Sequence, residues 1–214
     1  MNYIETLQCT QGRILLLEFH LERLKWGLYQ NDYPVTNLLI EQVRNTIINN
    51  SPKDKNTYKI RYLLEIEKTG KYSDRVEVSR ITPSSFETFS LGIYTQQKKA
   101  ATAPWNAKTT QRELYQAATQ WATKQSLDDA IILNEHGNII ETTIFNIFIL
   151  KDGILYTPPL SDMPVKGVFR TWMMYDSVFP IIEKSLTTDD LLNAESILLT
   201  NAVRGMQSGK IISL

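Results

Sequence analysis

The chain has 214 residues and carries 23 Lys and Arg against 23 Asp and Glu, so its formal net charge is zero. A neutral chain has no global field for nucleic acid or an anionic membrane, and we expect neither as a partner. One cysteine excludes an intrachain disulfide and favours a cytoplasmic location, the first residues lack a signal-peptide pattern, and no apolar run approaches the roughly 20 residues of a membrane helix.

Strands dominate the first half of the chain, with two helices among them. Hydrophobic alternation and turn residues predict strands at 3–9, 13–17, 57–67, 75–81 and 88–95. Apolar residues at helical spacing predict helices from about Glu18 and over 36–49. The segment 96–107 has no periodicity, and we interpret it as a linker between a small N-terminal α/β domain, 1–95, and a larger C-terminal domain, 108–214.

The second half mixes helices and strands. An amphipathic pattern predicts a helix over 110–125, and a Pro-rich loop leads into a second helix at about 168–178. A short helix is expected after Thr188, followed by a turn at Asn201–Gly205. Apolar runs predict strands at 129–134, 138–150, 153–156 and 195–200.

The familiar catalytic motifs are missing from the sequence. Two histidines and one cysteine are too few for a four-ligand zinc site, so we expect no metal. No serine lies in a nucleophile elbow, and neither GxGxxG nor GxxxxGK[ST] occurs. The candidates that remain are lysine, arginine and glutamate residues at the ends of the expected elements.

Lys108 and Glu141 are the first two candidates. Lys108 lies where the linker meets an expected helix, whose positive end disfavours a charged lysine and favours the neutral amine that attacks a carbonyl. A solvated lysine near a helix start is the ordinary explanation. Glu141 lies within an apolar strand, where it either faces outward or is paired; the functional interpretation is a carboxylate that holds a protonated pyridine nitrogen.

An anion site is the next possibility. His20 and Arg23 share one helix face, and the arginine either belongs to a surface pair or clamps a phosphate with two hydrogen bonds. The helix start at Gly167–Phe169 offers backbone N–H groups, as every helix start does, and the turn at Thr200–Ala202 is a second such place.

Taken in order, these segments resemble the class IV pyridoxal-phosphate enzymes over nearly the whole chain. The resemblance rests on YIETLQCTQGRILLLEFHLERL, KTTQRELYQAA, LDDAIILNEHGNIIETTIFNIF, YTPPLSDMPVKGVFR and LLTNAVRG. It implies a two-domain, N-terminally shortened α/β fold, pyridoxal 5'-phosphate as cofactor and a homodimer. It also implies roles for individual residues: Lys108 for the covalent attachment of the cofactor and for proton transfer, Glu141 for the ring nitrogen, and for the phosphate Arg23, Val168, Phe169, Asn201 and Ala202.

The family leaves three functions open for this chain. We favour an aminotransferase for a small amino acid and keto acid; the alternatives are a 4-amino-4-deoxychorismate lyase and a non-catalytic relative. The third is motivated by Phe169 and Ala202, which replace hydroxyl residues that usually contact the phosphate. We expect Arg204 and Arg61 to bind a substrate carboxylate; the alternatives are simple exposure for Arg204 and a structural ion pair for Arg61. Arg170 is expected to be structural.

Overall fold

The computed structural model describes residues 2–99 and 106–213, and these form two compact units. Unit 1 comprises Met1–Pro83 and Ala107–Gln111, and unit 2 comprises Ser84–Asn106 and Arg112–Leu214. The division therefore follows Pro83 rather than the expected linker at 96–107, because strand β5 (Thr88–Lys98) pairs with strands of unit 2. Residues 100–105 of that linker lie outside the described residues.

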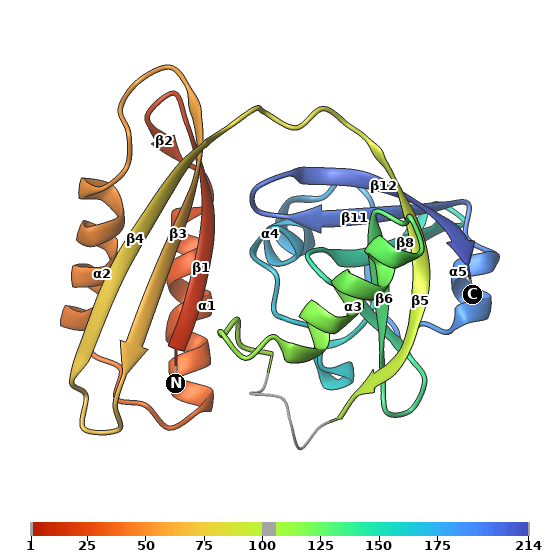
Figure 1. The fold of residues 1–214 in the computed structure, drawn as a ribbon, viewed down its shortest axis with the longest axis horizontal. Coiled ribbons are helices and arrows are strands. Elements are labelled where there is room, and N and C mark those ends of the chain that lie inside the picture. The colour runs from red at the N-terminus through yellow and green to blue at the C-terminus, as the bar shows by residue number, and fades with distance from the viewer. Residues whose placement is uncertain (1, 100–105, 214) are drawn as a thin grey trace. The chain divides into compact units, whose positions relative to one another are not determined.

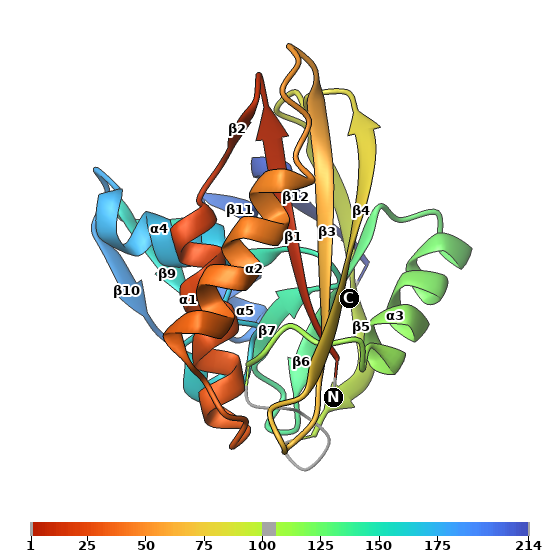
Figure 2. The same cartoon turned by 90° about the vertical axis from the view of Figure 1, so that its left-hand side faces the viewer.

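Unit 1 is a four-stranded antiparallel sheet with two helices on one face (Figures 1 and 2). The strands lie in the order β2-β1-β3-β4, with bounds β1 Asn2–Thr10, β2 Arg13–Ile14, β3 Thr57–Ile66 and β4 Tyr72–Ile81. The helices are α1 (Leu17–Gln30) and α2 (Asn37–Asn49). The strand expected over 13–17 is only two residues long, since α1 already begins at Leu17.

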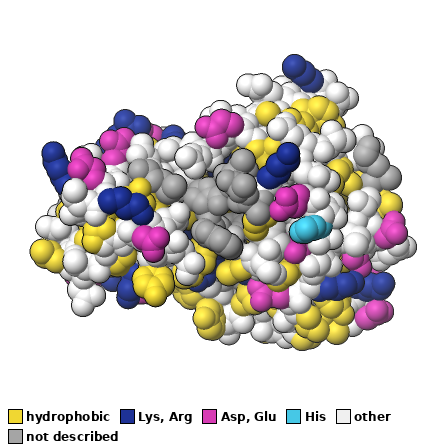
Figure 3. Space-filling model, turned by 90° about the horizontal axis from the view of Figure 1, so that it is seen from below, with side chains coloured by type: hydrophobic (Ala, Val, Ile, Leu, Met, Phe, Trp, Pro, Cys, Tyr) yellow, Lys and Arg dark blue, Asp and Glu magenta, His cyan; other side chains and the backbone are white. Residues whose placement is uncertain are grey.

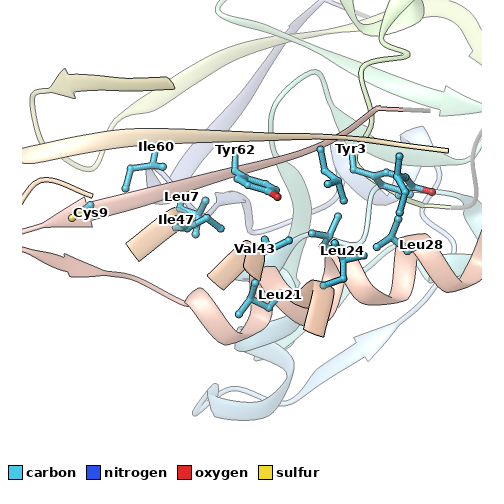
Figure 4. Packing of buried hydrophobic residues seen from close by; sticks show 14 residues of the cluster. Tyr3, Leu7, Cys9, Leu21, Leu24, Leu28, Val43, Ile47, Ile60 and Tyr62 are labelled. Atoms are coloured by element: carbon cyan, nitrogen blue, oxygen red, sulfur yellow. The ribbon is translucent and has the colours of Figure 1, made fainter. Parts of the chain in front are cut away.

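The core of unit 1 follows from the two periodicities of its elements. Every second residue of a strand faces the same side, so Tyr3 and Leu7 of β1 point toward the helices (Figure 4). Leu21, Leu24 and Leu28 recur at helical spacing on α1 and meet them there. All five side chains are at most 2% exposed, and each such burial stabilises the fold by about 1.5–3 kcal/mol.

Unit 2 is built on an eight-stranded sheet in the order β10-β9-β8-β11-β12-β5-β6-β7. An additional pairing of β8 with β7 closes six of these strands into a ring. Besides β5, the bounds are β6 Asp129–Asn134, β7 Ile139–Thr142, β8 Asn146–Lys151, β9 Ile154–Thr157, β10 Ile181–Glu183, β11 Ser196–Asn201 and β12 Gly205–Ser213. The pairings β5–β6, β5–β12 and β9–β10 are parallel.

Three helices flank this sheet: α3 (Glu113–Lys124), α4 (Val168–Asp176) and α5 (Thr188–Leu192). Strand β6 is buried on both faces: Ile131 packs inside the ring, whereas Ile132 packs under α3. A strand buried on both faces is apolar without alternation, which explains the run AIIL.

Two expected elements differ from the structure in ways that bear on the site. The strand expected over 138–150 is two strands, because Thr142 and Phe145 close a turn in which Phe145 N donates to Thr142 Oγ1 at 3.0 Å. The helix expected from 110 begins at Glu113, because the preceding residues pair with β1 instead: Ile4 N donates to Lys108 O at 2.9 Å. Lys108 thus belongs to unit 1, not to the C-terminal domain as predicted.

The surface carries charges of both signs. On the face drawn in Figure 3, acidic and basic side chains are interspersed rather than gathered into regions of one sign. Among the described residues, no helix combines the length and apolar character needed to cross a bilayer.

Candidate active site

Lys108 lies in the segment that pairs with the edge of β1. Its side chain is half-buried, and Nζ donates a hydrogen bond to Thr6 Oγ1 at 3.2 Å. Lys108 is therefore not at a helix start, contrary to the expectation from the sequence, since α3 begins five positions later. The amine lies beside strand β1 instead, where the backbone pairing of Lys108 with Ile4 and the hydrogen bond to Thr6 hold it.

Arg61 lies on the same face of the sheet as Thr6. The two residues are direct partners in the β1–β3 register, and such partners have Cβ atoms about 4.5–5.5 Å apart. Arg61 is 42% exposed, with Nη1 3.6 Å from Glu77 Oε2 on β4. Arg61 thus has a surface ion pair, and it lies opposite Thr6, the residue that Lys108 contacts.

A second set of side chains lies on the helical face of the same sheet. Arg23 of α1 donates from Nε to Glu5 Oε1 at 3.0 Å and from Nη2 to Glu5 Oε2. His20 Nδ1 lies 2.6 Å from the same Oε2. All three side chains are at most 7% exposed, so Arg23 and His20 are buried partners of Glu5 rather than a surface pair.

The ionisation of this set is governed by burial and by mutual charge. Burial would raise the pKa of Glu5, but the Arg23 guanidinium and the His20 hydrogen bond lower it to about 2. Burial lowers the pKa of His20 to about 4, with hydrogen bonding to Glu5 opposing the shift and the charges of Arg23 and Lys108 adding to it. At neutral pH the imidazole is therefore uncharged, and its Nδ1–H donates to the carboxylate. His20 Nε2 is buried and has no hydrogen-bond partner among the described residues.

Glu141 is in β7 of unit 2, where it is 4% exposed. Oε1 accepts from Tyr115 Oη at 2.5 Å, and the backbone N–H of Val165 reaches both oxygens, at 3.0 and 3.1 Å. Asn146 Nδ2 is 3.4 Å from Oε2. Oε1 thus has the shorter contacts and Oε2 the weaker ones, so Oε2 is the oxygen better able to accept from a ligand.

Lys98 and Tyr115 were not among the residues selected from the sequence. Lys98 Nζ lies 2.9 Å from Tyr115 Oη and 3.8 Å from Glu141 Oε1. The segment around Lys98 was interpreted as a linker, and Tyr115 reads as an ordinary core residue of an amphipathic helix. No local sequence signal would have identified either one as a neighbour of Glu141.

The start of α4 lies next to the Glu141 contacts. Asn146 Nδ2 donates to Val165 O at 2.9 Å, and a Cβ added at Gly167 would lie 1.6 Å from Asn146 Oδ1. Only glycine allows this approach. Val168 and Phe169, the first residues of α4, have backbone N–H groups of the kind that bind anions, while the Phe169 ring packs edge-to-face with Trp172 at 5.0 Å.

The turn between β11 and β12 contains the remaining predicted residues. Asn201 Oδ1 accepts from the backbone N–H of Val203 and Arg204, at 3.0 and 2.7 Å, so its side chain shapes the turn that also includes Ala202. The Arg204 guanidinium is exposed and lies 5.7 Å from the centre of the Phe89 ring. Arg170 is buried and donates to Pro158 O at 2.9 Å, which confirms its structural role.

The described residues hold no cluster of three or more His, Cys, Asp and Glu side chains that could bind a metal ion. The chemistry available is that of an amine and a guanidinium on one sheet of unit 1, and of a buried carboxylate beside a helix start in unit 2.

Solved structures identify the class of fold. A provisionally assigned amino-acid aminotransferase from Mesorhizobium loti superposes with a TM-score of 0.81 at 23% identity, covering 99% of both chains. A pyridoxal-phosphate-bound hypothetical aminotransferase from Mycobacterium tuberculosis has a TM-score of 0.82 at 20% identity, over 98% of this chain and 81% of that one. The fold is that of the class IV aminotransferases.

The sequence identifies the family. The amino-transferase class IV model matches residues 3–212, and the chain belongs to that family. A provisionally assigned aminodeoxychorismate lyase of Schizosaccharomyces pombe is 25% identical over 205 residues, which cover 94% of this chain and 86% of that protein. A provisionally assigned branched-chain aminotransferase of Methanocaldococcus jannaschii is 33% identical over 82 residues; the match covers 37% of this chain and only 28% of that relative. The family and fold expected from the sequence are confirmed.

Proposed function

We propose that this protein is a pyridoxal-phosphate enzyme that removes a proton from the amino-bearing carbon of its substrate. The observation that carries the proposal is Glu141, a buried carboxylate whose Oε2 has only the longer contacts, at 3.1 and 3.4 Å. A pyridinium N–H needs an acceptor of this kind. The amine of Lys108 and the N–H groups that open α4 fit the aldehyde and phosphate of the same cofactor.

Each residue has one task in this scheme. The bound cofactor supplies an electron sink for the substrate carbon, as such cofactors do. Lys108 attaches the cofactor and afterwards, as the neutral amine, takes the proton. Glu141 keeps the ring nitrogen protonated. The phosphate is held by Arg23 and by the backbone of Val168, Phe169, Asn201 and Ala202.

We favour the lyase among the possible reactions, which reverses the order expected from the sequence alone. The S. pombe relative aligns along 94% of this chain, whereas the branched-chain relative aligns along 37%. Such a lyase removes the proton at the amino-bearing carbon of 4-amino-4-deoxychorismate, and loss of the enolpyruvyl group then forms the aromatic ring of 4-aminobenzoate. The enolate that leaves takes up a proton and becomes pyruvate. The lyase needs no second substrate.

The aminotransferase is the second candidate, supported by the higher identity of that shorter segment. An aminotransferase leaves the amino group on the cofactor and requires a keto acid to remove it. Both reactions bind carboxylates, for which we propose Arg204 and Arg61. Arg61 has the stronger case because it lies opposite Thr6, the residue that Lys108 contacts.

Pyruvate release decides between the two reactions. The protein, reconstituted with pyridoxal phosphate, is incubated with 4-amino-4-deoxychorismate and no keto acid, and pyruvate is followed with lactate dehydrogenase. Stoichiometric pyruvate and 4-aminobenzoate support the lyase. Absence of pyruvate, with amino transfer from L- or D-amino acids only when a keto acid is present, supports the aminotransferase instead. Failure of the protein to bind pyridoxal phosphate rejects both and leaves the non-catalytic relative.

We also propose that the protein is a homodimer, as the family resemblance implies. Sedimentation equilibrium of the purified protein tests this, and a mass equal to the single 24.6 kDa chain contradicts it.

A further inference from the structure

Lys98, at the end of β5, is a buried cation in unit 2. It is 8% exposed, and Nζ donates to Tyr115 Oη at 2.9 Å and to Met163 O at 2.7 Å. A lysine in a protein interior is costly unless it is paired and hydrogen-bonded. Its charged partner is Glu141, whose Oε1 is 3.8 Å away.

Tyr115 connects the two charged groups. Its hydroxyl accepts from Lys98 and donates to Glu141 Oε1 at 2.5 Å, so the hydrogen bonds run in one direction from ammonium to carboxylate. The guanidinium of Arg112 lies 4.6 Å from the centre of the Tyr115 ring and donates to Thr143 O. The charged groups around the hydroxyl are thus Lys98, Glu141 and Arg112.

The same network holds the loop that leads into α4. Lys98 binds the carbonyl of Met163, a residue in the left-handed region with φ of 69°, and Glu141 binds the N–H of Val165. Asn146 Nδ2 donates a hydrogen bond to the carbonyl of Val165. Three polar side chains therefore fix the backbone just before the helix start that we assign to the phosphate.

Ionisation in this network agrees with the direction of its hydrogen bonds. Burial raises the pKa of Tyr115, and the charge of Glu141 adds to the shift, so the hydroxyl keeps its proton and remains a donor. Burial lowers the pKa of Lys98, and the charge of Glu141 opposes that shift.

We propose that Lys98 and Tyr115 are positioning residues: they balance the charge of Glu141 and fix Oε1, so that Oε2 is presented to the protonated ring nitrogen of the cofactor. This inference rests on the proposed function, because it takes the ligand of Glu141 to be pyridoxal phosphate. Neither residue touches the reacting atoms, and both act through the carboxylate.

Charge balance is tested first on the cofactor-free protein. Lys98→Met and Glu141→Gln each leave one buried charge without its partner, and each should lower the melting temperature by about 5 °C or more. The double variant removes both charges and should melt no lower than the less stable single variant. Lys210→Met, an exposed strand lysine of β12, is the control and should leave the melting temperature unchanged. Additive losses in the double variant overturn the proposal.

Positioning is tested on the holoenzyme with Tyr115→Phe, which removes one hydroxyl and keeps the ring. The pH profile of the visible absorbance of the bound cofactor should shift, and kcat should fall about tenfold, equivalent to about 1.4 kcal/mol, while KM changes less than twofold. A purely structural tyrosine would leave the absorbance profile and kcat as they are, and that result overturns the proposal even if the charges prove coupled.

Different results reject the proposed function and the positioning role of Lys98 and Tyr115. Wild-type protein that does not take up pyridoxal phosphate rejects the proposed function, and this inference with it. Wild-type protein that binds the cofactor and turns over, with Tyr115→Phe indistinguishable from it, rejects the positioning role alone.

Discussion

Each unit buries one carboxylate among polar partners, and the two sets of partners differ. Glu5 in unit 1 is held on both oxygens by a guanidinium and contacts an imidazole. Glu141 in unit 2 is held by a tyrosine hydroxyl, one backbone N–H and, at 3.4 Å, the side-chain amide of Asn146, with the ammonium of Lys98 at 3.8 Å. Both are at most 4% exposed. Burial alone therefore does not separate the carboxylate that anchors Arg23 from the one that we propose binds the cofactor.

The two carboxylates differ in the charge of their donors and in the lengths of the hydrogen bonds that they accept. The Arg23 guanidinium is a charged donor to both oxygens of Glu5, so Glu5 stabilises the contact between α1 and β1 and positions Arg23. Each oxygen of Glu141 accepts two contacts from neutral donors, and those of Oε2, at 3.1 and 3.4 Å, are longer than those of Oε1, at 2.5 and 3.0 Å. A carboxylate that binds a ligand is thus expected to have neutral donors and one oxygen with longer contacts.

The largest loss of activity is expected at Lys108. In our scheme, no other described group of unit 1 can take over the role of its amine. Lys108→Ala should abolish turnover and the visible absorbance of the bound cofactor without unfolding the chain. Lys124→Ala, an exposed residue of α3, is the control. Borohydride reduction of wild type followed by peptide mapping checks the attachment, and labelling of a different lysine contradicts the assignment.

Replacing each buried carboxylate, Glu141 or Glu5, by an amide tests directly whether the two have different roles. Glu141→Gln should cut turnover by about 10²-fold or more, because a neutral amide no longer stabilises the charge on the ring. The cofactor should remain bound. Glu5→Gln should act mainly on stability, since it leaves Arg23 buried without its counter-charge. Steady-state kinetics and denaturant titration of both variants separate the effects, and equal losses of activity would erase the distinction.

Breaking the buried pair of Arg23 and Glu5 should lower the free energy of unfolding more than breaking a surface ion pair. Arg23→Ala should lower the free energy of unfolding by about 3–5 kcal/mol, because Glu5 is left buried without its charged partner. Cofactor affinity, compared under folded conditions, should fall by about 1.5–3 kcal/mol if Arg23 also binds phosphate. Arg44→Ala, which breaks the surface pair with Glu18, should cost less than about 1 kcal/mol. An unchanged dissociation constant for Arg23→Ala places the phosphate elsewhere.

The pH dependence of stability should reveal His20. Its pKa is about 4 in the fold and 6.5 ordinarily, so the unfolded chain takes up the proton first and stability falls as the pH drops from 6.5 to 4, by roughly 3 kcal/mol. The pKa of Glu5 is about 2 in the fold and 4.5 ordinarily, so protonation of Glu5 in the unfolded chain lowers stability further as the pH falls below 4.5. His20→Gln should flatten the loss between pH 6.5 and 4, and the exposed His136→Gln should not. Identical profiles for the two variants would contradict the buried neutral imidazole.

The smallest stability effect is expected at Arg61. Its exposed ion pair with Glu77 is worth less than about 1 kcal/mol, so Arg61→Ala should barely change unfolding. If it binds a substrate carboxylate, KM should rise while stability stays the same. Arg80→Ala, on β4 but on the other face of the sheet, is the matched control. An unaltered KM for Arg61→Ala leaves Arg204 as the remaining candidate.

The sequence was sufficient where the signal is local. Leu21, Leu24 and Leu28 mark the buried stripe of α1 because residues three and four positions apart share a helix face. Motif segments around Lys108 and Glu141 gave the family, which the match over residues 3–212 confirmed. Both patterns depend only on residues that are close in the sequence, so they can be recognised without knowing the tertiary contacts.

The tertiary structure decided which distant groups meet. Lys98 lies 17 positions from Tyr115 and 65 from Met163, and Arg23 lies 18 positions from Glu5. Strand register and helix packing set such contacts, and periodicity in one segment does not encode its partner in another. Lys108 illustrates the same limit: its identity was readable, but its place on the edge of β1 followed from a backbone pairing 104 positions away, between Ile4 N and Lys108 O.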